Sequence, residues 1–141
     1  MHAADNLATI RHYFDVVTGK RSDRDLASFF ADDVTWQVPQ TNPSIRPNPR
    51  IGKAGVMDLL TSGVGIYRPG SMTMDLDTLF GDTQQVAARF TLHATLANGR
   101  DYHNQYAFIF ALRDGLITGV WEFLDTLYQA ERGAFDAISP G

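Results

Sequence analysis

The chain has 141 residues, of which 44% are hydrophobic and 11% aromatic, and its formal net charge is −4 at pH 7. This length and composition predict a single domain over residues 1–141 with one sizeable core, and they exclude a disordered chain. Because the sequence contains no cysteine, a disulfide framework, a Cys-ligated metal and a thiol nucleophile are also excluded.

Charge and hydropathy also limit the partners. Residues 1–70 carry a net charge of +1 and residues 71–141 a net charge of −5, so a nucleic-acid partner is not expected. The longest apolar run, residues 107–112, is far shorter than the roughly 20 residues that cross a bilayer, and no membrane association is expected. The first residues lack a basic segment followed by an apolar one, which favours a cytoplasmic location.

Three helices are predicted in the first half of the chain. Residues 5–19 place Leu7, Ile10, Phe14 and Val17 at helical spacing. A second, shorter helix is predicted over residues 23–31 and a third over residues 52–64, each with apolar residues along one side.

Strands dominate the remainder. Residues 34–38 alternate and predict a first strand, whereas residues 39–50 hold four of the six prolines and predict an irregular loop, either functional or disordered. After residue 70 the period changes to two, with turn signals at Asn98-Gly99 and Asp114-Gly115. The expected strands are residues 72–80, 85–96, 100–113 and 116–127, followed by a short helix within residues 128–138.

This order predicts an α+β fold in which three N-terminal helices pack on a curved, mostly antiparallel β-sheet. A bent sheet closed by helices forms a cone with an apolar interior, which suits a small hydrophobic ligand.

Glu122 is the most informative residue. It is one of only two glutamates, since 14 of the 16 acids are aspartate, and it lies between Trp121 and Phe123 in an apolar strand. A carboxylate buried there costs several kcal/mol unless it is paired, hydrogen-bonded or protonated. Desolvation would raise its pKa toward the range useful for general acid–base chemistry. The alternative is a carboxylate at the rim, paired with an arginine or a helix N-terminus.

Two-residue turns at both hairpins set the expected register. They place Ala107 opposite Glu122 and Phe90 opposite Ala107, so that Gln105 shares the inner face with Glu122. The other face is still too aromatic for open water, and we expect a second subunit to cover it, giving a homodimer. A single β-bulge would reverse part of this assignment.

Several segments together resemble the SnoaL-like proteins of the NTF2-like (ketosteroid isomerase-like) superfamily. They are residues 29–36 (FFADDVTW), 104–110 (NQYAFIF), 113–117 (RDGLI) and 122–125 (EFLD). The resemblance extends from about residue 7 to residue 127. It implies the cone-shaped NTF2-like fold, in a superfamily that includes cyclases, isomerases, dehydratases, epoxide hydrolases and non-catalytic binders.

The resemblance implies a role for some residues and not for others. Glu122 falls where epoxide-hydrolase-like members place an active-site aspartate and phenazine-biosynthesis members a glutamate. The arginine-x-aspartate pair of the epoxide hydrolases is incomplete at Arg89-Phe90-Thr91, because no acid occurs between Asp82 and Arg100. Tyr13 matches the helix tyrosine of ketosteroid isomerases, but their aspartate after the first strand is missing.

The site residues follow from these considerations. Glu122 is the expected acid–base group, Gln105 is expected to hold the substrate or orient Glu122, His103 is either a proton shuttle or a solvated residue, and Asp125 either takes part or is structural. The pocket wall is expected to contain Tyr13, Trp36, Met57, Leu60, Phe90, Leu92 and Leu124. No metal and no cofactor are expected, because the four histidines show no ligand spacing and no phosphate-binding loop occurs.

The sequence therefore favours a cofactor-independent enzyme that moves a proton on an apolar cyclic substrate, as a polyketide-cyclase-like protein, isomerase or dehydratase. Two alternatives remain open. One is a non-catalytic small-molecule-binding or protein-interaction module of the same fold, and the other is an assembly domain of a larger complex.

Overall fold

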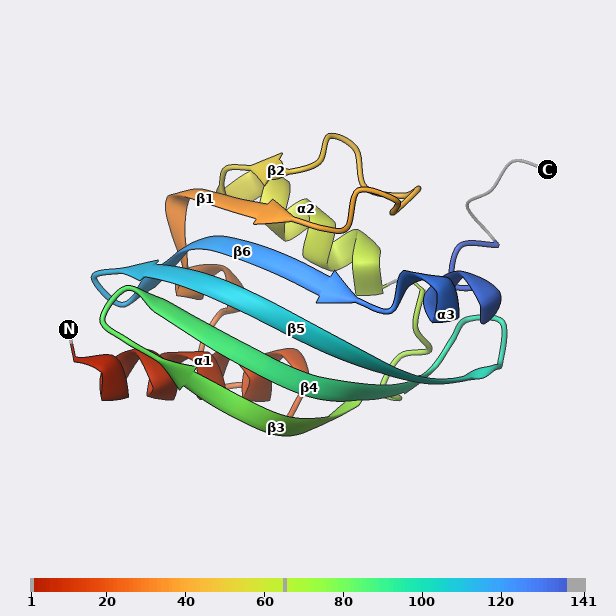
Figure 1. The fold of residues 1–141 in the computed structure, drawn as a ribbon, viewed down its shortest axis with the longest axis horizontal. Helices are drawn as coiled ribbons and strands as arrows, with labels where there is room; N and C mark the ends of the chain where they lie inside the picture. Colours follow the sequence, from red (N-terminus) through yellow and green to blue (C-terminus); the bar gives the residue numbers. More distant parts are fainter. Residues whose placement is uncertain (1, 65, 137–141) are drawn as a thin grey trace.

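The computed structural model describes residues 2–64 and 66–136. Within them six strands form one curved sheet in the order β2-β1-β6-β5-β4-β3 (Figure 1). Neighbouring strands are antiparallel except β1 and β6, which run parallel. The strands are β1 (Phe30–Gln37), β2 (Arg50–Ile51), β3 (Thr73–Gly81), β4 (Gln85–Thr95), β5 (Asp101–Arg113) and β6 (Leu116–Leu124).

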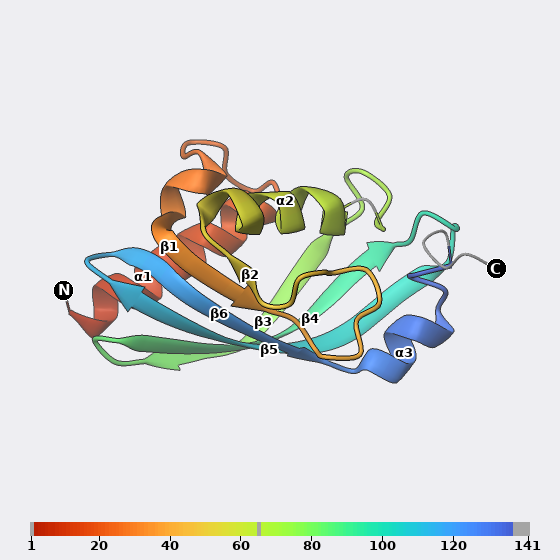
Figure 2. The ribbon, with the colours of Figure 1, turned by 90° about the horizontal axis from the view of Figure 1, so that it is seen from above.

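Helices α1 (Ala3–Val17) and α2 (Lys53–Val64) lie on the same side of the sheet, and α3 (Thr126–Glu131) lies at one end (Figure 2). The α+β class with a curved sheet is confirmed. The prediction of three N-terminal helices is wrong, because residues 23–31 form only the 3-10 turn Leu26–Phe29 before entering β1. Phe30 and Ala31 are buried in that strand, where Phe30 pairs with Ile117. Of the predicted tail helix, residues 137 and 138 lie outside the described residues.

The two long hairpins differ from the predicted register by one residue each. Leu96 donates its N–H to the carbonyl of Arg100, so the first turn has three residues and ends at Gly99, whose φ is +87°. The Asp114-Gly115 turn has two residues as predicted, since Arg113 pairs with Leu116. A β-bulge then follows at Thr118, because Leu112 pairs with Ile117 but Ala111 pairs with Gly119.

Together these two shifts exchange the inward-facing and outward-facing residues of β5, and they leave the faces of β4 and β6 as predicted. Phe90 pairs with Tyr106, and Glu122 pairs with Phe108. Tyr106 and Phe108 therefore join Phe90 and Glu122 on the concave face, while the residues between them on β5 face outward. The predicted inward positions of Gln105 and Ala107 are wrong for this reason.

Aromatic side chains pack between α1 and the concave face of the sheet. The ring of Tyr13 packs edge-on against Phe29, Phe30 and Phe110, with centroids 5.6 to 5.9 Å apart. Phe14 makes similar contacts with Phe90 and Phe110. Such pairs each contribute about 0.5–1.5 kcal/mol beyond the area that they bury. This packing fixes α1 over the sheet.

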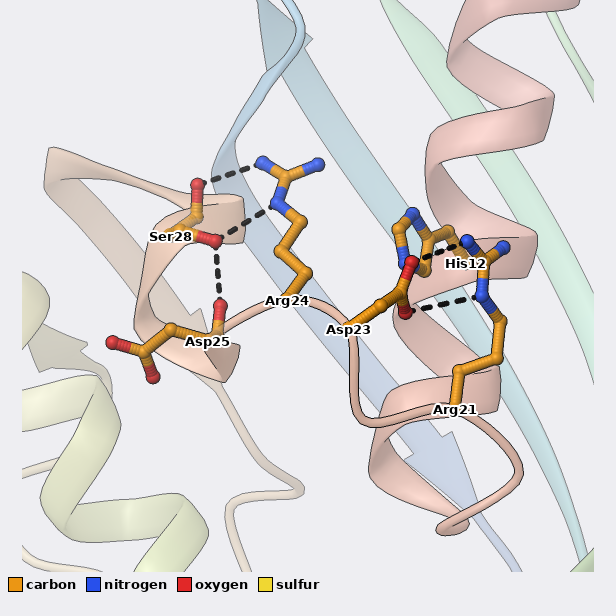
Figure 3. Close-up of polar contacts among 6 residues, drawn as sticks. All are labelled: His12, Arg21, Asp23, Arg24, Asp25 and Ser28. Atoms are coloured by element: carbon orange, nitrogen blue, oxygen red, sulfur yellow. Dashed lines mark hydrogen bonds and ion pairs between the residues drawn. The ribbon is translucent and has the colours of Figure 1, made fainter.

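A surface network holds the connection between α1 and the 3-10 turn (Figure 3). The carboxylate of Asp23 accepts hydrogen bonds from Arg21, 2.6 Å from Nη2, and lies 3.1 Å from Nε2 of His12. Arg24 donates to the hydroxyl of Ser28 and packs its guanidinium 3.9 Å above the ring of Phe29. Half of the Asp23 side chain remains in solvent.

None of the helices in the described part of the chain is both long and apolar enough to cross a membrane.

Candidate active site

A cavity of about 390 Å³ lies between the helices and the concave face of the sheet. Its wall combines residues from both helices that cover the sheet, the concave face of the sheet, and the segment that follows β1. Most of these side chains are apolar or aromatic, as in small-molecule sites. The lining includes Tyr13, Phe14, Val17, Trp36, Val38, Ile45, Leu59, Leu60, Ile66, Tyr67, Met72, Met74, Phe90, Leu92, Tyr106, Phe108, Glu122, Gln129 and Phe135.

Glu122 is the sole carboxylate that lines this cavity among the described residues. The alternation of β6 directs it inward, while its neighbours Trp121 and Phe123 point to the outer face. One of its oxygens, Oε1, accepts a hydrogen bond of 3.1 Å from the indole Nε1 of Trp36. The central prediction from the sequence, a carboxyl group directed into an apolar hollow, is thus confirmed.

The surroundings of Glu122 raise its pKa to about 7, from an ordinary value of 4.5. Burial among apolar groups is the main cause, and the hydrogen bond from Trp36 opposes it by stabilising the charged form. A carboxylate has about four lone-pair sites, and one indole N–H satisfies one of them. Both protonation states are therefore populated near neutral pH, as general acid–base chemistry requires.

Tyr13 projects from α1 into the same cavity and is almost fully buried. Burial, and secondly the nearby charge of Glu122, raise the pKa of its phenol well above the ordinary value of 10. The hydroxyl is therefore neutral at physiological pH and can donate a hydrogen bond to a ligand.

A second polar group in the wall is a chain of tyrosine hydroxyls. The hydroxyl oxygen of Tyr106 lies 2.8 Å from that of Tyr102 and 3.3 Å from that of Tyr67. Tyr67 and Tyr106 line the cavity, whereas Tyr102 lies behind them and is fully buried. Burial raises the pKa of all three phenols, so all three are neutral.

Asn104 anchors the buried end of this chain. Its Nδ2 donates to the hydroxyl of Tyr102 over 2.8 Å and to the backbone carbonyl of Asp125 over 3.0 Å, while its Oδ1 accepts from the N–H of Gln105. A carbonyl can only accept and an N–H can only donate, so these two contacts fix the orientation of the amide. Asn104 is 3% exposed. It is buried because it pairs with Leu92 of β4 and faces the concave side of the sheet.

The proline-rich segment after β1 forms part of the cavity wall. Asn48 closes its base by donating to the carbonyl of Val38 and accepting from the N–H of the same residue. Inside the loop, Oδ1 of Asn42 accepts from the backbone N–H and the hydroxyl of Ser44. Asn42, Ser44 and Ile45 line the cavity, which fits the expectation of a functional loop.

The predicted wall residues Tyr13, Trp36, Leu60, Phe90 and Leu92 line the cavity. Met57 and Leu124 are only partly buried. They pack against the core and are not among the residues that line the cavity.

Gln105 and His103 do not have the predicted position, because the register shift places both on the outer face, where both are exposed. His103 instead lies beside His93, with 2.7 Å between the two Nδ1 atoms, and Nε2 of His93 lies 2.8 Å from the carboxylate of Asp75.

Asp125 caps α3, where its Oδ1 accepts from the N–H of Tyr128 over 3.0 Å. This contact agrees with the structural alternative for Asp125. No group of three or more potential metal ligands occurs among the described residues.

The sequence-based prediction missed Tyr67, Tyr102, Asn104 and Tyr106. A signal for three of them was present, because residues 102, 104, 106, 108, 110 and 112 are larger and more aromatic as a set than the residues between them. That alternation predicts the buried face of the strand independently of the turn lengths. Tyr67 lies before β3, in a segment without a periodic pattern.

The family model of the SnoaL-like domain matches residues 10–120, and the chain therefore belongs to the SnoaL-like family. No curated protein shows significant similarity to it.

Several solved structures have the same fold. TerC co-crystallised with polyporic acid superposes with a TM-score of 0.73 at 22% identity, covering 90% of this chain and 96% of TerC. A protein from Jannaschia sp. CCS1, assigned as a SnoaL-like polyketide cyclase, gives 0.75 at 16% identity, covering 98% and 95%. An NTF2-like protein of unknown function from Burkholderia pseudomallei K96243 gives 0.72 at 17% identity, covering 90% and 95%.

Proposed function

We propose that the protein is a cofactor-independent small-molecule enzyme, of the polyketide-cyclase, isomerase or dehydratase type, that uses Glu122 as a general acid and base on an apolar cyclic substrate. The observation that carries this proposal is a single carboxyl group, with a pKa of about 7, in the wall of a largely apolar cavity of about 390 Å³. The SnoaL-like family and the fold shared with a polyketide cyclase support the same class.

The chemistry follows from the geometry. In its charged form Glu122 accepts a proton from a carbon or oxygen of the bound substrate, and in its neutral form it returns that proton to another atom. Trp36 donates to one carboxyl oxygen, and the other accepts no hydrogen bond from the described residues, which leaves it available to the substrate. The aromatic walls exclude water and hold a ring in place.

The proposal is tested by proton exchange on an enolisable ring ketone. In D₂O the wild type should speed the hydrogen–deuterium exchange of 2-tetralone, measured by NMR, and Glu122→Gln should lower the catalysed rate at least about 100-fold. Glu131→Gln is the matched control, because Glu131 is the other glutamate of the sequence and lies exposed on α3. Equal rates for Glu122→Gln and wild type, or no catalysis by the wild type, would contradict the proposal.

A non-catalytic small-molecule-binding module is the second candidate. It is favoured by the position of Gln105 and His103, since two predicted helpers lie outside the cavity. The pKa of Glu122 separates the two functions and can be measured by ¹³C NMR of the labelled carboxyl group. A value near 7 favours the enzyme, and one near that of a free glutamate favours the module.

We also propose that a second copy covers the outer face of β5 and β6. Ala107 pairs with Phe123 there, and Ile109 pairs with Trp121. Phe123 is 56% exposed. All four residues are uncharged, and the exposed Arg89 borders them on β4, where it pairs with Ala107, so a two-fold contact would place an apolar patch against itself with a charged residue beside it. Sedimentation should show a homodimer for the wild type and a monomer for Phe123→Asp, and a monomeric wild type at micromolar concentration would contradict this arrangement.

A further inference from the structure

The outer face of the sheet carries a pair of imidazole groups that the proposed function does not use. His93 of β4 and His103 of β5 are directly opposite each other, because the three-residue turn that ends at Gly99 sets this register. Their Nδ1 atoms lie 2.7 Å apart, and their ring centroids lie 4.9 Å apart. Two histidines ten residues apart show no ligand spacing in the sequence, but strand pairing brings their nitrogen atoms together.

The two Nδ1 atoms point at each other and share one proton. At 2.7 Å one of them donates and the other accepts, since two lone pairs or two N–H groups would repel each other. A carboxylate can only accept, so Nε2 of His93 carries a proton and donates it to Asp75 over 2.8 Å. Nδ1 of neutral His93 is therefore a lone pair, and His103 supplies the proton between the rings.

A metal ion can take the place of that proton. With metal–nitrogen bonds of about 2.0–2.1 Å, two adjacent ligand nitrogens are about 2.9 Å apart in square-planar geometry and about 3.3 Å apart in tetrahedral geometry. The rings therefore need to separate by only about 0.2–0.6 Å. The proton of His103 moves through solvent to Nε2 of the same ring, so both ligands remain neutral imidazoles.

Three adjacent strands hold this pair in position. All eleven residues of β4 pair with β5, and the hydroxyl of Tyr128 accepts from the backbone N–H of His103. β3 places Asp75 opposite Thr91, on the same outer face as His93. A carboxylate that accepts from the second nitrogen of a histidine ligand fixes the tautomer and orientation of that ring.

Charge and access also favour a cation here. Asp101 pairs with Thr95 on the same face, so two aspartates lie beside the rings, and residues 71–141 carry a net charge of −5. The side chain of His93 is one-third exposed, and His103 is exposed. Neither histidine belongs to the patch proposed as the contact between two copies.

We propose that His93 and His103 bind one divalent transition-metal ion through their Nδ1 atoms, and that Asp75 positions His93 for this. Imidazole nitrogens suit Zn²⁺ and Cu²⁺. The described residues offer no group of three ligands, so water completes the coordination. The ion joins β4 to β5 on the face of the sheet opposite the cavity, and the site does not depend on the function proposed above.

Calorimetric titration with ZnCl₂ tests the site in chelator-treated protein without an affinity tag. Wild type should bind one ion per chain, and His93→Gln and His103→Gln should each weaken binding about 100-fold, because one of two ligands is lost. His12→Gln is the matched control and should stay within about twofold. His12 also lies beside an aspartate, Asp23, but no second histidine contacts it in the part of the chain that the structure describes.

The positioning role of Asp75 has its own readout. Asp75→Ala should weaken Zn²⁺ binding about 10-fold, and Asp75→Asn should recover most of this loss, because the amide oxygen still accepts from Nε2 of His93. In ¹⁵N NMR of the Zn²⁺-bound wild type, His93 should be coordinated through Nδ1 and protonated at Nε2, whereas Asp75→Ala should show both tautomers. Equal affinity and equal spectra for Asp75→Ala and wild type would contradict this role.

Electron paramagnetic resonance of Cu²⁺ bound to wild type keeps the test independent of the folding of any variant. The spectrum should show hyperfine coupling to two equatorial nitrogens, and that of His103→Gln to one. Absence of saturable binding, a wild-type spectrum with fewer than two nitrogens, or unchanged affinity in both histidine variants would overturn the metal site.

Discussion

Asp23 and Glu122 are two carboxylates with opposite surroundings. Asp23 lies on the surface with the guanidinium of Arg21 and the ring of His12 beside it, and these hydrogen bonds hold its pKa well below the ordinary value (Figure 3). Glu122 lies in an apolar wall, where the part of the chain that the structure describes supplies one neutral donor, and burial raises its pKa to about 7. The number and charge of the donors, together with access to water, decide whether a carboxylate in this protein is a permanent anion or a group that exchanges its proton.

The largest expected effect of this difference is on catalysis. Glu122→Gln should lower the exchange of 2-tetralone by about 10³-fold, because the group that carries the proton is gone. Asp23→Asn should leave the rate within about twofold, because Asp23 does not line the cavity. A large loss for Asp23→Asn, measured in the same NMR assay, would show that the two sites are coupled.

The second prediction concerns the pH dependence of stability. Glu122 binds its proton more tightly in the folded protein than in the unfolded chain, so the resulting stabilisation is complete below pH 4.5 and is lost as the pH rises through 7. For a change of this size the loss is about 3 kcal/mol. The free energy of unfolding, from urea denaturation at pH 4.5 and pH 8, should fall by that amount in wild type relative to Glu122→Gln.

If the free energy of unfolding changed equally between pH 4.5 and pH 8 in wild type and in Glu122→Gln, the pKa of Glu122 would be ordinary. Aspartates with lowered pKa, including Asp23, change the stability below about pH 4 instead, where it falls as the pH falls. They are present in both proteins and cancel in the difference.

The third prediction concerns a variant in which the surroundings of Glu122 are still less favourable for a charge. Trp36→Phe removes the hydrogen-bond donor to Glu122 that occurs among the described residues, so the pKa of Glu122 should rise, by about one pH unit. The midpoint of the pH–rate profile for exchange should move upward by the same amount. A midpoint that stays near 7 would show that the indole contributes little to the pKa.

The smallest expected effect is on the surface network. Asp23→Asn removes an exposed ion pair, and such pairs stabilise a folded protein only slightly, so Tm should fall by about 2 °C or less at pH 7. Because the folded-state pKa of Asp23 is lowered, its contribution is present above its ordinary pKa and is lost as the pH falls. Calorimetry at pH 7 and pH 3 should therefore show a smaller difference between variant and wild type at pH 3.

The sequence allowed the family, the fold class and the inward position of Glu122 to be predicted, because they depend on residue types and on alternation within one strand. The partners of Glu122 were less predictable, because they depend on register. One additional residue in the turn at Gly99 and one at the bulge of Thr118 exchanged the faces of β5. That change moved Gln105 and His103 outward and brought Tyr106 and Asn104 inward.

The helix predicted over residues 23–31 shows a different source of error. Residues 23–31 have helical spacing, but the burial of Phe30 and Ala31 in β1 outweighs this local preference. The carboxylate of Asp25 then caps the short turn that remains by accepting from the N–H of Ala27. Local pattern therefore predicted which residues are buried more successfully than which element buries them.

The loop closed by Asn48 and Val38 has a consequence for how the protein can change. It supplies Asn42, Ser44 and Ile45 to the cavity, yet its two ends are fixed to each other by side-chain hydrogen bonds at the end of β1. Apart from Ile45, which belongs to the buried core, we expect the residues between these ends to be exchangeable without disturbing the pairing of the sheet that positions Glu122. Under the proposed function, selectivity and reactivity would belong to separable parts of the chain, and libraries that randomise residues 40–44 and 46 would show whether the scaffold can be redirected toward new ligands.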